Sequence, residues 1–171
     1  YSAAYLVKIK NNGDTIWKKQ YNFSSVGGDF FDVVKELPDK NYLVVGTTYD
    51  SIIGNGDVFL AKIDTNGILI WKKNYSHVNI DQSNSMEITP DNKIIIVGVT
   101  TPNTSTYWDI LLIKTDLSGN MIWRKTIGNA FEEVFLSIQV TKNNPEYLLG
   151  GREGYYNMSN PYFDFGIVRT D

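Results

Sequence analysis

The chain has 171 residues, of which 42% are hydrophobic and 13% aromatic, and its formal net charge is −3. This balance predicts a domain with its own core and argues against a nucleic-acid partner, which would need a strong excess of positive charge. No cysteine is present, so disulfides, thiolate metal sites and cysteine nucleophiles are excluded.

The predicted elements are all strands, because β-branched and aromatic residues abound and no segment keeps a helical period of 3.6. Residues 3–21 predict two strands, and residues 29–75 predict four, at 29–37, 41–48, 57–64 and 68–75. The four-strand pattern returns in 81–127, and 133–171 predict its first three strands once more. The longest apolar run, 94–99, is far shorter than the roughly 20 residues of a membrane helix, so we expect no membrane insertion.

The same residues recur at a steady interval. Trp17, Trp71 and Trp123 are separated by 54 and 52 residues, and a glycine four residues before each tryptophan repeats with them. Internal repetition with a period of about 50 residues is typical of propellers and solenoids.

The turns and edges can also be inferred. Asp64 and Asp116 open turns that a glycine with positive φ closes three residues later. Pro38 and Pro90 suit the second position of a tight turn between the first two strands of a unit. The second strand of each unit is apolar on both faces, which predicts a covered sheet. The fourth strand carries lysines, which predicts an outer edge.

The pattern D-x-x-G-x-x-x-W, at Asp64 to Trp71 and again at Asp116 to Trp123, resembles the repeats of secreted bacterial β-propellers. These are the delta-sixty-type and related repeats of Bacteroidota surface proteins, and the strand order is also similar to kelch blades. In the first copy Lys10 replaces the aspartate. The resemblance implies a propeller scaffold and an extracellular or cell-surface location in a bacterium.

We therefore predict an all-β chain of four-stranded antiparallel propeller blades with a period of about 52–55 residues. Residues 1–171 would be one propeller segment: an outer half-blade at 3–21, blades at 29–75 and 81–127, and a partial blade at 133–171. These three repeats plus one strand make an incomplete ring, because about four blades is the smallest closed propeller. The remaining blades would come from the same longer chain or from an assembly.

Ligand binding is expected on the variable loops between the second and third strands and between successive units. The candidate binding residues are loop aromatics, which offer contact area at low entropic cost: Tyr107, Trp108, Tyr155, Tyr156, Tyr162 and Phe163. The alternative is that these rings pack between adjacent blades.

The recurrent polar residues are expected to be structural. Asp57, Asp109 and Asp164 would cap loops or strand ends, because calcium needs more closely spaced acidic ligands. Lys62, Lys114 and Arg169 would make hydrogen bonds between blades. The single histidine, His77, is expected to be solvated and not catalytic.

The sequence thus favours a non-catalytic module without a cofactor or metal, which binds a protein or glycan through its loops or serves as a scaffold. The alternative is part of a propeller enzyme, such as a quinone-dependent dehydrogenase or a polysaccharide lyase, with its site in blades outside this chain.

Overall fold

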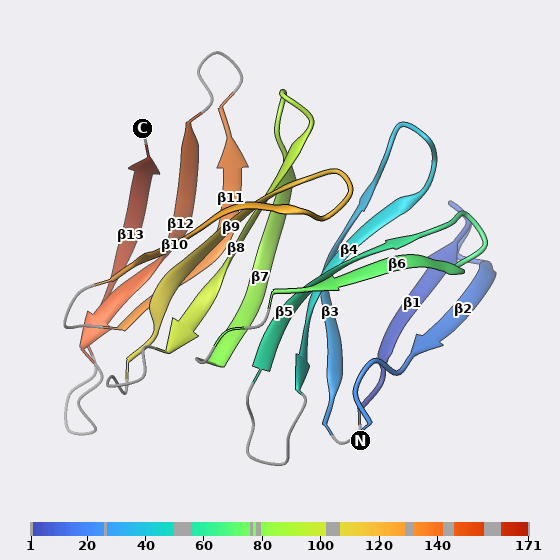
Figure 1. Cartoon of the computed structure of the whole chain (residues 1–171), viewed down its shortest axis with the longest axis horizontal. Coiled ribbons are helices and arrows are strands. Elements are labelled where there is room, and N and C mark those ends of the chain that lie inside the picture. Colours follow the sequence, from blue (N-terminus) through green and yellow to red (C-terminus); the bar gives the residue numbers. More distant parts are fainter. Residues whose placement is uncertain are drawn as a thin grey trace.

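The structure is a computed structural model that describes the chain except residues 1, 26, 50–55, 76, 78–79, 102–106, 129–131, 142–145, 156–161 and 171. For residues 155 and 162–170 it describes the backbone alone. The described strands form antiparallel sheets of two, four, four and three strands. The sheets follow one another in chain order along the long axis, as an open row and not a closed ring (Figure 1).

Each sheet is a meander in which every strand pairs with its neighbour in the chain. The first sheet holds β1 (Ala4–Ile9) and β2 (Thr15–Tyr21). The second holds β3 (Asp29–Glu36), β4 (Tyr42–Tyr49), β5 (Gly56–Ile63) and β6 (Leu69–Asn74). The third holds β7 (Ile80–Ile88), β8 (Lys93–Thr101), β9 (Asp109–Asp116) and β10 (Met121–Ile127). The fourth holds β11 (Glu132–Val140), β12 (Tyr147–Tyr155) and β13 (Tyr162–Thr170). The four strands predicted between 29 and 75 are confirmed to within one residue at each end.

The turns form as the sequence predicts. The Asp64 carboxylate accepts hydrogen bonds from the backbone N–H groups of Asn66 and Ile68, and Gly67 closes the turn with a φ of 78°. Between β3 and β4, Lys40 N–H donates to the carbonyl of Leu37 over 2.9 Å, which leaves Pro38 at the second position of the turn. Tight turns of this kind fix which strands pair and in which register.

The predicted covering of the second strand and the predicted outer edge are both confirmed. β4 and β8 are buried along almost their whole length, whereas β6 and β10 lie at the edges of their sheets. Apolar side chains from both faces of each four-stranded sheet enter the cores between sheets. The core between the second and third sheets consists mainly of Leu43, Val45, Val58, Leu60, Met86, Ile94, Ile96, Leu111 and Ile113. The core between the third and fourth includes Ile95, Val97, Ile110, Leu112, Phe135, Ile138 and Leu149.

A recurring contact joins the first sheet to the second and the second to the third, and we call it the seam. The Tyr21 hydroxyl, at the end of β2, donates to the carbonyl of Gly67 in the second sheet over 2.8 Å. The Tyr75 hydroxyl, after β6, donates in the same way to Gly119 in the third sheet over 3.0 Å. A Cβ on Gly119 would lie 2.9 Å from a ring carbon of Trp71. A Cβ on Gly67 would likewise lie 3.3 Å from Trp17, so the turn glycines of the second and third sheets each meet the tryptophan of the preceding sheet.

Candidate functional site

Buried acidic side chains stand at the beginning of β3, β7 and β11, the first strands of the last three sheets. Asp29, Asp81 and Glu133 are separated by 52 residues, and each is almost completely buried. Asp29 accepts hydrogen bonds from the backbone N–H of Phe23 over 2.6 Å and from the Thr48 hydroxyl over 2.7 Å. Because the acid recurs in each sheet, we interpret it as part of the scaffold.

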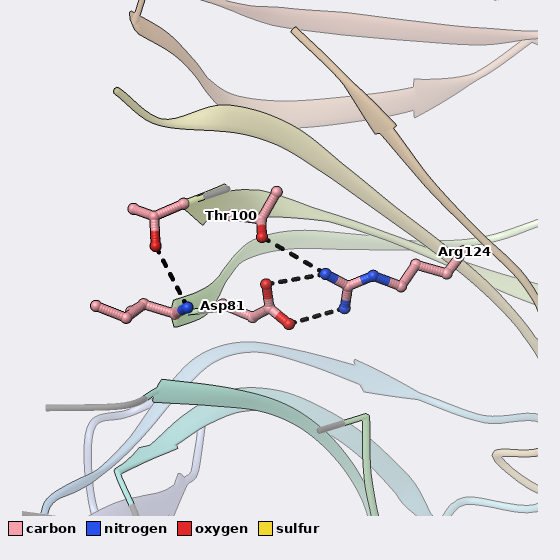
Figure 2. Close-up of polar contacts among 5 residues, drawn as sticks. Asp81, Thr100 and Arg124 are labelled. Carbon is pink, nitrogen blue, oxygen red and sulfur yellow. Dashed lines mark hydrogen bonds and ion pairs between the residues drawn. The ribbon is translucent and has the colours of Figure 1, made fainter. Parts of the chain in front are cut away.

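Asp81 forms a bidentate ion pair with Arg124. Arg124, from β10, binds both of its carboxylate oxygens, over 2.7 and 3.0 Å, and also reaches the Thr100 hydroxyl over 3.5 Å (Figure 2). Asp81 is 0% exposed and the Arg124 side chain 16%. This bidentate pair, withdrawn from water, joins β7 and β10, the two edge strands of the third sheet.

A polar pocket lies between β3 and β4 of the second sheet and β7 of the third. We call it the inner pocket; its volume is about 290 Å³, and it is lined by Phe30, Asp32, Thr47, Tyr49, Gln82, Ser83 and Asn84. Thr47 and Ser83 are buried at its base, whereas Phe30 and Asp32 are exposed. The pocket therefore opens to solvent beside an aromatic ring and a carboxylate.

Two hydrogen-bonded groups build the walls of the inner pocket. The Ser83 hydroxyl donates to Asp32 over 2.5 Å, and its backbone N–H donates to the Thr47 hydroxyl over 3.1 Å. The Gln82 side-chain amide donates to the Tyr49 hydroxyl over 2.8 Å. Each of these contacts joins the second sheet to the third, so the pocket exists only where the two sheets meet.

The position of Asp32 is set by a β-bulge. The register of β3 shifts between Phe31 and Val33, which makes Asp32 the extra residue. The same shift recurs around Asn84 in β7 and Leu136 in β11, again 52 residues apart. Bulges re-aim the side chain that they carry. The scaffold therefore offers this position in every unit, and only the second sheet fills it with an acid.

The electrostatics of the inner pocket centre on Asp32. The surrounding protein removes enough water to raise the pKa of this carboxyl, and the hydrogen bond from Ser83 offsets part of that rise. Burial, together with the negative charge of Asp32, also raises the pKa of the Tyr49 phenol. The charge of the Asp32 carboxylate therefore affects the ionisation of the neighbouring Tyr49 hydroxyl.

The predicted loop aromatics are only partly visible. Tyr107 and Trp108 lie just before β9 and are both half-buried, and the Trp108 carbonyl accepts a 2.7 Å hydrogen bond from the backbone N–H of Glu133 in the fourth sheet. Tyr155 and Tyr162 pair at the ends of β12 and β13, with Phe163 next along β13. Their side chains, and the whole of Tyr156, lie outside the described residues. The structure therefore leaves the predicted aromatic platform a prediction.

Other predicted residues have mixed outcomes. Asp57 and Asp109 lie at the starts of β5 and β9, as expected, and within the described residues no group of three or more metal-binding side chains is found. The prediction of hydrogen bonds between units is wrong for Lys62, which binds Asp39 of its own sheet over 2.7 Å because the turn between β3 and β4 brings that acid alongside β5. His77 is exposed.

Lys114, the second recurrent lysine, has contacts both within its own sheet and with the next sheet. The Lys114 ammonium group lies 3.7 Å from Asp91 of its own sheet and 5.8 Å from the centre of the Tyr147 ring in the next sheet. Burial alone would lower the pKa of Lys114, but the interactions of its ammonium group with Tyr147 and Asp91 outweigh burial and raise the pKa. Lys114 therefore contributes to the packing of successive sheets.

The sequence prediction missed both the buried acids and the inner pocket. The 52-residue spacing of Asp29, Asp81 and Glu133 is visible in the sequence and could have identified the former. The pocket gives a weaker signal: Asp32 and Gln82 occupy positions where the neighbouring units carry Asn84 and Phe30. A residue type that differs from its counterparts in the other units is not required by the packing that all units share.

Comparisons with known proteins add no relatives: no protein-family model matches the chain, and no curated protein is significantly similar to it. Among the described residues, no helix has the length and apolar character needed to cross a membrane.

Proposed function

We propose that the chain is a segment of a β-propeller and serves as a non-catalytic binding module of a secreted or cell-surface bacterial protein. The partner would be a protein or a glycan bound at the variable loops. The seam carries the architectural part of this proposal. The same contact joins the first sheet to the second and the second to the third, and repetition of such a step about an axis would build a propeller.

The outer face of the first sheet supports the presence of further blades. Tyr5 and Val7 on β1 are 50% and 47% exposed, yet Phe59 and Leu111, which occupy the position of Tyr5 in the next two sheets, are completely buried. In those sheets the corresponding face packs against the preceding sheet. The face that carries Tyr5 and Val7 thus suits coverage by another sheet, from the same polypeptide or from an assembly.

The position of Trp108 supports binding at the loops. Its backbone is held at the junction of the third and fourth sheets, and its half-buried side chain lies at the end of the sheets where the connections vary. A rigid scaffold that presents changeable loops is the usual arrangement of binding sites on repeat proteins.

Electron microscopy of the natural full-length protein tests the architecture. We expect a closed disc of at least four blades, whereas an open row of sheets covered by an unrelated domain would refute the propeller. A glycan array and a proximity-labelling experiment on intact cells test the binding role and the location. Trp108→Ala should abolish binding of the glycan or protein that these experiments identify. Trp17→Phe, at the seam, is the control. Binding unchanged by Trp108→Ala would contradict a role for this loop.

A further inference from the structure

We infer that the inner pocket binds a primary ammonium group carried on a short apolar stem. Such a group is found on small alkylamines and on the lysine side chains of a partner protein. This inference goes beyond the proposed loop-face function, because the pocket is built from strand residues at the junction of two sheets.

Charge gives the first reason for a cationic ligand. Asp32 is the only charged side chain that lines the inner pocket, and no ion pair to it is found within the described part of the chain. By contrast, Asp39 and Asp81 each have a cationic partner within 2.7 Å. A partly desolvated carboxylate favours a neighbouring positive charge, and here a ligand would have to supply it.

The hydrogen-bonding capacity of the walls gives the second reason. The Ser83 hydroxyl donates to Asp32, and one N–H of each side-chain amide is engaged, that of Gln82 with the Tyr49 hydroxyl and that of Asn84 with the carbonyl of Phe135. Across the described residues, the Gln82 and Asn84 side-chain oxygens and one Asp32 oxygen accept no hydrogen bond. An ammonium group offers three donors and no acceptor, which matches a lining rich in acceptors.

The aromatic residues give the third reason and suggest the apolar stem. Phe30 is 47% exposed, and its ring meets the Tyr49 ring edge-on, with 6.0 Å between centroids. An aliphatic stem can pack on such a ring, and a cation near its face gains further attraction. A calcium ion would suit the lining less well, because it takes six to eight oxygen ligands and usually several carboxylates.

Titration of the isotope-labelled full chain, followed by nuclear magnetic resonance, tests the inference. The probe is butylammonium chloride, and butan-1-ol at matched ionic strength is the neutral comparison. We expect saturable shifts of the Gln82 and Asn84 side-chain amide signals with the amine and none with the alcohol. Asp32→Asn should weaken amine binding at least tenfold, or about 1.4 kcal/mol. Glu36→Gln removes the same charge from the exposed end of β3 and should leave binding unchanged.

Asp32→Asn keeps an oxygen that can accept the Ser83 hydroxyl, so we expect its fold to persist, as the backbone spectrum would show. Phe30→Ala should weaken binding of butylammonium more than binding of methylammonium, because only the longer amine has a stem to pack. An Nα-acetyl-lysine amide that binds more tightly than butylammonium would identify a protein lysine as the ligand, and the reverse order would identify a free amine.

Three outcomes would overturn the inference. The first is equal binding of butylammonium to the parent and to Asp32→Asn, and the second is equal binding of butan-1-ol and butylammonium to the parent. The third is that no amine binds, whether or not a methyl glucoside binds in its place. None of them depends on whether the loops bind a partner, so a failure here is distinguishable from failure of the proposed function.

Discussion

Replacement of Arg124 by methionine should destabilise the protein strongly. The substitution keeps much of the aliphatic bulk but removes both hydrogen bonds to Asp81, at 2.7 and 3.0 Å, and leaves a carboxylate that is 0% exposed without its cation. Removal of one partner from a buried ion pair typically costs about 3–5 kcal/mol. The double variant Asp81→Leu/Arg124→Met should recover most of this loss, because it leaves no uncompensated charge.

Urea-induced unfolding, followed by tryptophan fluorescence, measures these free energies. Lys40→Met provides the control, because the ion pair of Lys40 with Glu36 is exposed and should contribute at most about 1 kcal/mol. A loss below about 1 kcal/mol for Arg124→Met, or a double variant as unstable as the sum of the two single ones, would refute the reasoning from burial.

Three further predictions concern the seam and the inner pocket. Gly119→Ala should cost about 2–3 kcal/mol in chemical unfolding, because a Cβ would combine strain at a φ of 77° with a 2.9 Å approach to Trp71. Gly13→Ala, at a φ of 91° with no atom within 4 Å, should cost only about 1 kcal/mol, and equal losses would argue against a packing role for the glycine. Tyr75→Phe should lose about 1–2 kcal/mol, because it leaves a buried carbonyl without its donor; an unchanged unfolding midpoint would count against the seam. The raised pKa of Asp32 means that its contribution to stability is present below the ordinary carboxyl pKa and is lost as pH rises through the folded-state pKa. Asp32→Asn should therefore gain stability relative to the parent between pH 3 and pH 7 in thermal unfolding, and a loss at pH 7 would show that Asp32 has a structural role instead.

Much of the fold could be predicted because the repeat supplies several independent copies of each signal. The turn glycines, the edge lysines and the doubly apolar second strands each appear at least twice, so local and periodic signals agree. The seam was not predicted, although its glycines and tryptophans were recognised as members of the repeat. Gly67 was expected to close a hairpin, and nothing local to the turn shows that its carbonyl also accepts a hydrogen bond from Tyr21 of another sheet.

The candidate site was much less accessible to sequence reasoning. The inner pocket joins side chains about 50 residues apart, such as Asp32 and Ser83, and their contact depends on the bulge in β3 and on the angle between two sheets. Neither property is encoded in a pattern of strands and turns. Loop aromatics attracted the prediction because they are conspicuous in the sequence, whereas a single aspartate within an apolar strand is not.

The seam has a direction, and this has consequences for how the chain can change in length. At both junctions where the seam is observed, the tyrosine and tryptophan at the end of one unit contact the turn of the following unit. A tandem duplication of about 52 residues therefore brings with it both halves of the contact needed at each new junction. The inner pocket differs from the seam in this respect, because its lining comes from two successive sheets and duplication of one unit would copy only one of its walls.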